Sequence, residues 1–226
     1  MLFRSPWICR GDSITLVASG AATYAWAPNT GLSSGTGNTV TAYPSTTTNY
    51  SVIGTDIYGC TATWPITVTV HFPVMSITPT DSICDGQSTT LVSNGAVSYQ
   101  WAPPSGLNTT TAATVIASPT VTTTYTLIGY DNYNCSDTLQ SVVTVFPQPV
   151  ADFGFTPAEG CDPVTVVFTD SSTFALNWQW TFSDGTTDSV QNPVHTFVGP
   201  GTYDVILYVS GLNNCNDQSV DRKSTR

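Results

Sequence analysis

The stretch Tyr24-Ala25-Trp26-Ala27-Pro28 recurs as Tyr99-Gln100-Trp101-Ala102-Pro103, 75 residues further along the chain. The same offset aligns residues 9–60 with residues 84–135 without a gap, and each segment begins and ends with a cysteine. A period of this length is too long for one turn of a thin solenoid. The repeat therefore predicts two tandem domains of the same fold.

Each copy predicts short β-strands separated by turns. Tyr24 and Trp26 share one face of a strand, because side chains alternate along a strand. Thr, Val, Tyr and Ile favour strands, whereas the chain holds one Glu and one Lys, both strong helix formers. In the first copy we expect strands at residues 13–19, 24–26, 39–43, 49–55 and 63–70.

The last third of the chain has a different pattern. Trp178, Trp180 and Phe182 share one strand face, and alternate residues from Tyr203 to Val209 form the apolar face of the longest strand. Frequent turns and two apolar sheet faces predict a sandwich. We place the modules at residues 6–72, 76–147 and 150–220, joined by stiff proline-containing linkers. The third is expected to lack its closing strand.

The two ends have an unusual composition. Four of the five basic residues lie within residues 1–5 and 221–226. Both ends have the sequence that a common sequencing adapter encodes when it is translated. We therefore expect these two segments not to be native and exclude them from the predicted fold.

The charge of the chain excludes several classes of partner. It carries 15 acidic and 5 basic residues, a formal net charge of −10. Such a chain repels nucleic acid and anionic membranes. No stretch reaches the roughly 20 apolar residues of a membrane span. We expect no nucleic-acid partner and no membrane insertion.

The six cysteines fall two to a module. Their separations within a module are 51, 51 and 54 residues. Small sandwiches need covalent crosslinks to be stable. Matched cysteine spacing in an all-β chain indicates an oxidising compartment. We predict the disulfides Cys9–Cys60, Cys84–Cys135 and Cys161–Cys215, and therefore an extracellular or cell-surface location.

The third module resembles a PKD (polycystic kidney disease) domain. Residues 180–185 (WTFSDG), 192–197 (NPVHTF) and 200–205 (PGTYDV) stand in the order of that family's motifs. Thr181 and Ser183 replace an Asp and a Gly of the family pattern. The resemblance gives structural roles to this set: Trp180, Phe182, Asp184, Gly185, His195, Gly201 and Tyr203.

The resemblance extends to the whole chain. The two repeats are similar to the Ig-like or PKD-like modules that precede such domains in surface proteins of gliding bacteria. The fold class is therefore all-β, with three tandem small Ig-like/PKD-like β-sandwich modules. It implies a non-catalytic extracellular spacer or adhesion role, with a surface or extracellular ligand such as a neutral glycan or a protein. The alternative is a carbohydrate-binding accessory role beside a polysaccharide-degrading enzyme.

Three short motifs could suggest other activities, and we assign no catalytic residue to any of them. Gly31–Gly35 fits the nucleophile elbow G-x-S-x-G, but that motif requires a following helix, and strand residues follow here. Arg10-Gly11-Asp12 is the integrin tripeptide, yet Gly11 is better explained as a turn residue. His195 has no second histidine nearby and is expected to form a structural hydrogen bond.

We predict no metal and no cofactor. There is no C-x-x-C spacing, and His71 and His195 lie 124 residues apart. Aspartates gather near the predicted module ends and are expected to cap turns, with calcium as the alternative: Asp56, Asp81, Asp85, Asp131 and Asp137. Trp26, Trp101 and Trp180 are expected in the cores, whereas Trp7, Trp64 and Trp178 are unassigned.

Overall fold

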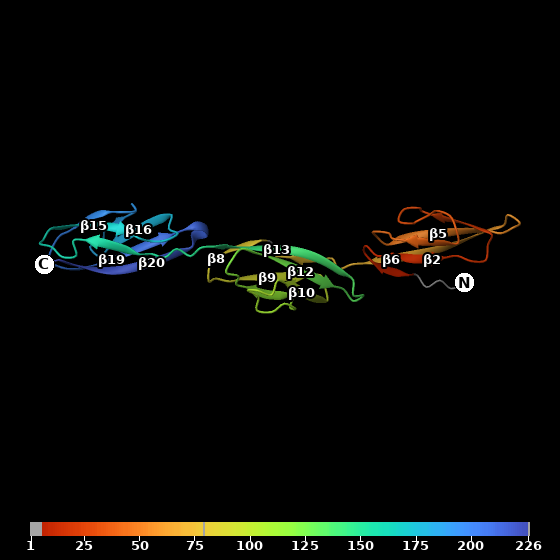
Figure 1. Cartoon of the computed structure of the whole chain (residues 1–226), viewed down its shortest axis with the longest axis horizontal. Helices are drawn as coiled ribbons and strands as arrows, with labels where there is room; N and C mark the ends of the chain where they lie inside the picture. The colour runs from red at the N-terminus through yellow and green to blue at the C-terminus, as the bar shows by residue number, and fades with distance from the viewer. Residues whose placement is uncertain (1–5, 79, 226) are drawn as a thin grey trace.

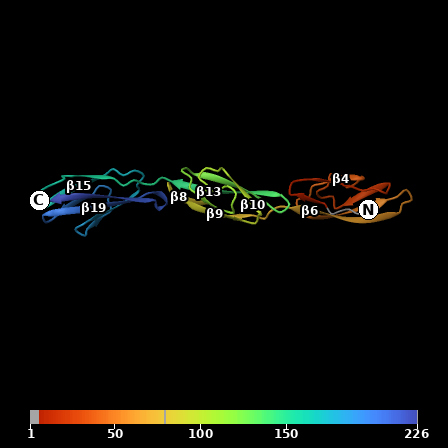
Figure 2. The same cartoon turned by 90° about the horizontal axis from the view of Figure 1, so that it is seen from below.

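A computed structural model describes residues 6–78 and 80–225, with side chains described as far as Asp221. Three β-sandwiches lie end to end in one extended line, with the middle module between the other two (Figure 1). Figure 2, turned by 90°, shows the same line, so the arrangement is a rod. The predicted all-β fold of tandem sandwiches is confirmed. No helix among the described residues is long and apolar enough for a membrane span.

Module 1 packs a four-stranded sheet, in the order β1-β6-β5-β3, on the pair β2-β4. Strand β1 runs parallel to β6 and pairs Cys9 with His71 at the end of β6. The strands are β1 (Trp7–Cys9), β2 (Ile14–Val17), β3 (Thr23–Ala27), β4 (Thr39–Ala42), β5 (Thr48–Thr55) and β6 (Thr61–His71).

Module 2 repeats this plan with one additional strand. Its sheets have the orders β10-β12-β13-β8 and β11-β9-β7. The strands are β7 (Ser76–Ile77), β8 (Asp81–Cys84), β9 (Thr89–Asn94), β10 (Ser98–Ala102), β11 (Thr114–Ala117), β12 (Thr123–Tyr130) and β13 (Ser136–Phe146).

Module 3 packs β14-β15-β18 on β17-β16-β19-β20. A short 3-10 turn, η1 (Leu212–Asn214), joins the last two strands. The strands are β14 (Phe153–Thr156), β15 (Val164–Asp170), β16 (Asn177–Phe182), β17 (Thr187–Asp188), β18 (Val194–Phe197), β19 (Gly201–Ser210) and β20 (Asn216–Thr225).

Each module has its own core, centred on a tryptophan. Trp26, Trp101 and Trp180 are all buried, as predicted. Each indole N–H donates to a backbone carbonyl, of Gly37, Ala112 and Val190 in turn. Burying the ring while satisfying its one donor makes tryptophan a suitable centre for a small sandwich. The aromatic alternation in the sequence therefore locates the cores.

The predicted unpaired edge in module 3 is wrong. Strand β20 pairs with β19 from Asn216 opposite Ser210 to Thr225 opposite Gly201. An antiparallel ladder is held by backbone hydrogen bonds and does not require an apolar face on the added strand. At the positions where module 2 has Val143 and Val145, β20 has Lys223 and Thr225.

The expectation that residues 1–5 are not native lies outside the described residues.

Candidate functional site at the module junctions

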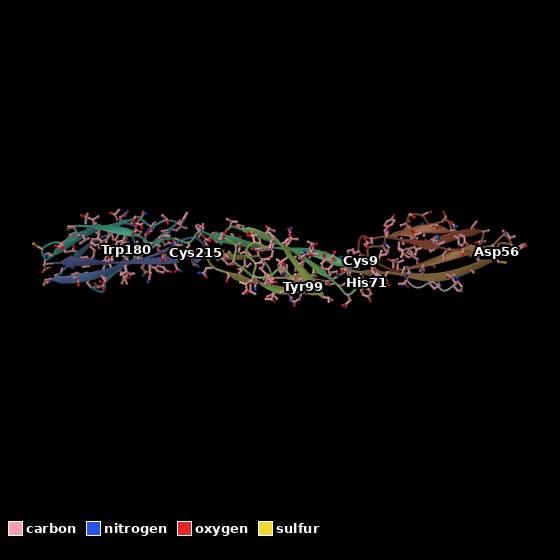
Figure 3. All side chains as sticks on the ribbon, turned by 60° about the horizontal axis from the view of Figure 1, so that its bottom comes forward. Cys9, Asp56, His71, Tyr99, Trp180 and Cys215 are labelled. Carbon is pink, nitrogen blue, oxygen red and sulfur yellow. A yellow bond between two sulfur atoms is a disulfide. The ribbon has the colours of Figure 1, made fainter. Side chains whose placement is uncertain are left out.

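The disulfides cross from one module to the next. Cys9 is bonded to Cys135, with their Cα atoms 5.2 Å apart, and Cys84 is bonded to Cys215, with their Cα atoms 5.7 Å apart. Cys60 and Cys161 are exposed free thiols. The predicted pairing of one bridge per module is therefore wrong. Figure 3 shows Cys9 and Cys215 at the two junctions of the rod.

The strand directions explain why the two cysteines of one module do not meet. Cys9 pairs with His71 at the end of β6, whereas Cys60 immediately precedes the start of β6 at Thr61. An 11-residue strand spans roughly 35 Å. A disulfide needs Cα atoms within about 7 Å. Each cysteine can therefore reach only a cysteine of a neighbouring module.

A carboxylate holds the second cysteine of modules 1 and 2, Cys60 and Cys135, in a tight turn. In module 2 the Oδ1 atom of Asp131 accepts the N–H groups of Tyr133 and Cys135, at 2.8 and 2.9 Å. Asn134 adopts a left-handed φ of 62°. This turn directs Cys135 and Tyr133 toward the preceding module. The Asp-x-Tyr spacing before the cysteine was the signal that sequence reasoning missed.

Aromatic rings close the first junction. The rings of Tyr133 and His71 are stacked, with centroids 3.6 Å apart, and Trp7 lies 5.5 Å from Tyr133. The Arg10 guanidinium lies 3.2 Å from the centre of the Phe72 ring. The arginine of the integrin-like tripeptide therefore packs at the junction. Cation–π and stacking contacts of this kind stabilise partly buried interfaces.

The linker that follows module 1 packs closely against the surface of module 2. The backbone of Val74 and Met75 lies so close to Gly95 that a Cβ there would collide with it. The Met75 thioether packs against Gly129 and likewise leaves no room for a side chain. Strand β7 then continues along β9. The linker is therefore packed against module 2.

The second junction is polar where the first is aromatic. The Ser82 hydroxyl donates to Asn213 Oδ1 at 3.2 Å, and Asn213 Nδ2 donates to the Ser82 carbonyl at 3.4 Å. In the linker, Gln148 hydrogen-bonds the Asn216 carbonyl of module 3. Both junctions therefore combine a disulfide with direct contacts.

The PKD-like motif forms a local network in module 3. His195 stacks on Phe182, with centroids 4.1 Å apart, and its Nε2 lies 2.7 Å from Asp184 Oδ2. Asp184 Oδ1 accepts the backbone N–H and the hydroxyl of Thr186. Burial alone would raise the pKa of Asp184, but the hydrogen bonds from Thr186 and His195 outweigh it and lower that pKa. The pair links the β16–β17 turn of one sheet to β18 of the other sheet.

The remaining motif residues lie in turns and strand starts around this network. Gly185 has φ +92°, which a side chain rarely adopts, at the β16–β17 turn. Gly201 begins β19. The Tyr203 hydroxyl donates to the Val198 carbonyl at 2.8 Å, and its ring lies 4.5 Å from that of Phe197. These contacts are all internal to the module.

Of the aspartates singled out by sequence, Asp56 and Asp131 hold turns, whereas Asp81 and Asp137 lie in strands β8 and β13. Asp56 and Asp131 accept backbone N–H groups. Hydrogen bonds from Thr89 and from the Ser82 N–H lower the pKa of Asp81. Asp137 caps the Thr138 N–H, and the Asp85 N–H donates to the Phe146 carbonyl. In the described part of the chain, no three His, Cys, Asp or Glu residues are grouped to hold a metal.

The other candidate residues are separated. Ser33 forms a two-way pair with Thr41, its Oγ accepting the Thr41 N–H. Trp178 is partly buried and donates to Asp170, whereas Trp64 is 55% exposed on β6. Burial raises the pKa of Asp170, but hydrogen bonds from Ser172, Gln191 and Trp178 outweigh it and lower that pKa. The fold brings together two groups of residues, those of the junctions and those of the His195–Asp184 network.

Comparisons with known proteins agree with the fold. Residues 147–225 match the family model described as the PKD domain. The PKD1 domain of the Vibrio cholerae metalloprotease PrtV is 21% identical, with a TM-score of 0.32, over 34% of this chain and 96% of that domain. A Methanosarcina mazei structure is 36% identical, with a TM-score of 0.29, over 34% of this chain and 53% of the other.

A tandem Ig structure matches along the entire chain. The eight N-terminal Ig domains of Down Syndrome Cell Adhesion Molecule are 15% identical, with a TM-score of 0.50. The match covers 100% of this chain and 36% of that one. No curated protein matches. The predicted PKD-like third module and the Ig-like fold of the tandem modules are confirmed.

Proposed function

We propose that this chain, two Ig-like modules followed by a PKD domain, is a non-catalytic spacer outside the cell or at its surface. The observation that carries the proposal is the disulfide across each junction of the rod. A bond between neighbouring modules restrains the angle between them. A spacer of fixed length requires this property.

The chemistry of the junctions supports an extracellular location. Disulfides persist in oxidising compartments and are rare where glutathione keeps thiols reduced. Modules of about 70 residues bury small cores, so crosslinks contribute a large share of their stability. The net charge of −10 disfavours self-association of such rods.

The placement of polar groups supports a non-catalytic role. The His195–Asp184 pair is engaged with Phe182 and Thr186 inside module 3, between the β16–β17 turn and β18. A general base must reach a proton of a bound substrate. The role of these two residues is better matched to joining strands than to chemistry.

A neutral glycan remains the alternative ligand. Trp64 is 55% exposed and borders a hollow on module 1, as a sugar-stacking ring would. Trp7 instead contacts Tyr133 at the junction, and Trp178 is bonded to Asp170. Stacking along a polysaccharide needs several exposed rings in one row, so the arrangement favours the spacer.

Small-angle X-ray scattering of the oxidised chain tests the spacer. Three modules of roughly 40 Å each predict a particle about 120 Å long. Replacing Cys9 and Cys84 by Ser removes both bridges and should broaden the distribution of distances between modules. The matched control replaces the free cysteines, Cys60 and Cys161, and should leave the curve unchanged.

A different result would contradict the proposal. If the oxidised wild-type chain already scatters as a flexible string of modules, the bridges do not fix its length. The spacer role would then be wrong even with both disulfides formed.

A further inference from the structure

The far tip of module 1 carries a copy of the turn that joins modules 1 and 2. Asp56 Oδ1 accepts the N–H groups of Tyr58 and Cys60 at 2.8 and 2.9 Å, as Asp131 does for Tyr133 and Cys135. Gly59, at φ +86°, stands where Asn134 has φ 62°. Figure 3 places Asp56 at the tip of the rod.

At this tip, the side chains that bind in module 2 are exposed. Tyr58 is 84% exposed, its neighbour Ile57 is 79% exposed, and Cys60 is an exposed free thiol. In module 2 the equivalent Tyr133 stacks on His71, and the equivalent Cys135 is bonded to Cys9. The corresponding Cys215 of module 3 is also bonded to the module before it.

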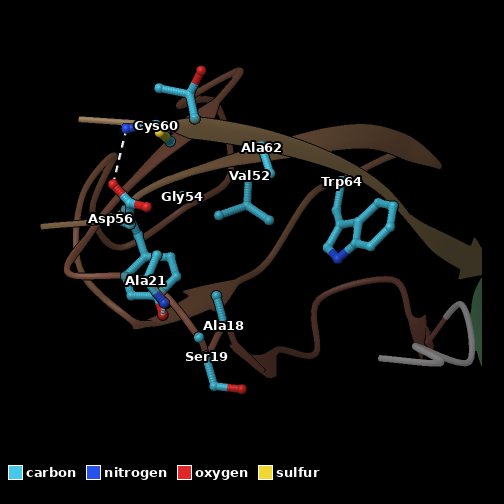
Figure 4. Close-up of a pocket in the computed structure, with 12 residues that line it drawn as sticks. Ala18, Ser19, Ala21, Val52, Gly54, Asp56, Cys60, Ala62 and Trp64 are labelled. Carbon is cyan, nitrogen blue, oxygen red and sulfur yellow. Dashed lines mark hydrogen bonds between the residues drawn. The ribbon is translucent and has the colours of Figure 1, made fainter. Parts of the chain in front are cut away.

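A cavity beside this turn provides a second, independent observation. Module 1 has a hollow of about 330 Å³ lined by Ala21, Tyr24, Gly54 and Trp64, among others (Figure 4). The equivalents of Ala21 and Gly54 in module 2 are Ala96 and Gly129. Met75 of the incoming linker occupies that place in module 2. The hollow in module 1 therefore corresponds to the place where the linker residue Met75 packs in module 2.

The opposite tip carries the complementary half. Cys161 lies between β14 and β15, as Cys84 lies between β7 and β9, and it is an exposed free thiol. In modules 1 and 2 this segment provides the cysteine that bonds to the next module. Each tip thus has one half of a junction.

From these observations we propose that the tip formed by Asp56–Cys60 and the adjoining cavity binds a further sandwich module of the same kind. The occupant is a module that ends as module 1 does, with a cysteine closing its first strand, an aromatic ring beside it and an apolar linker side chain. Its cysteine bonds to Cys60, its ring packs on Tyr58, and its linker fills the cavity. This inference goes beyond the spacer role and does not depend on it.

The covalent step needs an oxidant, and a small disulfide such as oxidised glutathione suffices. The Cys60 thiolate attacks oxidised glutathione, forms a mixed disulfide and releases one reduced glutathione. The thiolate of the incoming module then attacks the Cys60 sulfur and expels the second glutathione. Two thiols are oxidised and one small disulfide is reduced, and the two thiol protons end on the two reduced glutathiones.

The test lengthens the chain by one module. A second copy of residues 6–80 is inserted ahead of Pro6, with Cys60→Ser in the added copy. The offset of 75 places the added Cys9 at a separation of 126 residues from the native Cys60, equal to that of Cys9 and Cys135. After oxidation in glutathione buffer, non-reducing peptide mapping should find a Cys9–Cys60 peptide in addition to the Cys9–Cys135 peptide.

The expected strength of the new bond can be measured within the same molecule. The effective concentration of the new Cys9–Cys60 thiol pair, measured against glutathione, should lie within about tenfold of that of the Cys9–Cys135 pair. Tyr58→Ala in the lengthened chain should lower it by roughly three- to tenfold, the effect of losing an aromatic contact. The unlengthened chain, treated identically, is the control and should form no disulfide between Cys60 and another cysteine of the chain.

The proposal is overturned if Cys60 stays a free thiol in the lengthened chain while Cys9–Cys135 and Cys84–Cys215 form. It is equally overturned if Cys60 bonds instead to Cys161 of another molecule. Formation of the two existing bridges shows in either case that the chain has folded. Failure of the spacer proposal would appear in scattering and would not change these peptides.

Discussion

At the scale of single residues, Asp184 joins two parts of module 3 through one carboxylate. Its Oδ1 accepts hydrogen bonds from Thr186, and its Oδ2 lies 2.7 Å from the Nε2 atom of His195. The His195 ring is stacked on the buried Phe182. The lowered pKa of Asp184 means that the folded state prefers the ionised carboxylate. Ionisation and folding are therefore linked at this position.

Replacing Asp184 with Asn should reduce the pH dependence of stability. A lowered pKa contributes stability above the ordinary carboxyl pKa of about 3.9, and this is lost as pH falls through the folded value. Thermal unfolding of wild type and Asp184→Asn should therefore differ most near pH 6 and converge near pH 2. Asp162→Asn is unsuitable as a control because Asp162 accepts the Gly199 N–H. A gap that persists unchanged at pH 2 would contradict the linkage.

At the scale of elements, the five-residue turn determines where a cysteine points. Asp131 and Asp56 form the same hydrogen bonds, but only the turn of Asp131 carries a bonded cysteine among the described residues. The two turns therefore serve as a natural pair for comparison. The turn of Asp131 lies in a junction, and the turn of Asp56 faces solvent.

Replacing Asp131 with Ala should weaken the Cys9–Cys135 bond. The change removes the acceptor of two backbone N–H groups, a loss of about 1 kcal/mol for a partly exposed site. The effective concentration of the bond against glutathione should fall by roughly fivefold or more. Asp56→Ala is the matched control and should leave it unchanged. Equal effects from both substitutions would show that the turn does not direct Cys135.

The elements also show what sequence can predict. Trp26, Trp101 and Trp180 alternate with small or polar neighbours, and this local pattern located strands and cores. The cysteine pairing depends instead on which strand ends lie together. The separations are 51, 51 and 54 residues within a module and 126 and 131 residues between modules, and both sets are closely matched, so spacing could not distinguish them. The parallel pairing of β1 with β6, which moves Cys9 to the far end, has no local signal.

At the scale of the whole molecule, the two disulfides overlap along the chain. One encloses residues 9–135 and the other encloses residues 84–215. Together they form a covalent path from Cys9 to Cys135, back along the backbone to Cys84, and across to Cys215. That path uses residues 1–9, 84–135 and 215–226, about 70 of the 226 residues.

Pulling the two ends apart would therefore load only part of the protein. Under mechanical tension the covalent path tightens first, and it traverses module 2 while bypassing residues 10–83 and 136–214. Single-molecule force spectroscopy of the oxidised chain should show one unfolding step that releases at most about 180 Å, since an extended residue spans up to roughly 3.6 Å. The reduced chain should show three steps.

The variant lacking Cys60 and Cys161 should behave as the oxidised wild type, because neither thiol lies in a bridge. Three steps from the oxidised chain would show that tension does not follow the disulfides. With the bridges intact, tension passes through the middle module between Cys84 and Cys135, whereas residues 10–83 and 136–214 of the outer parts lie outside the loaded path.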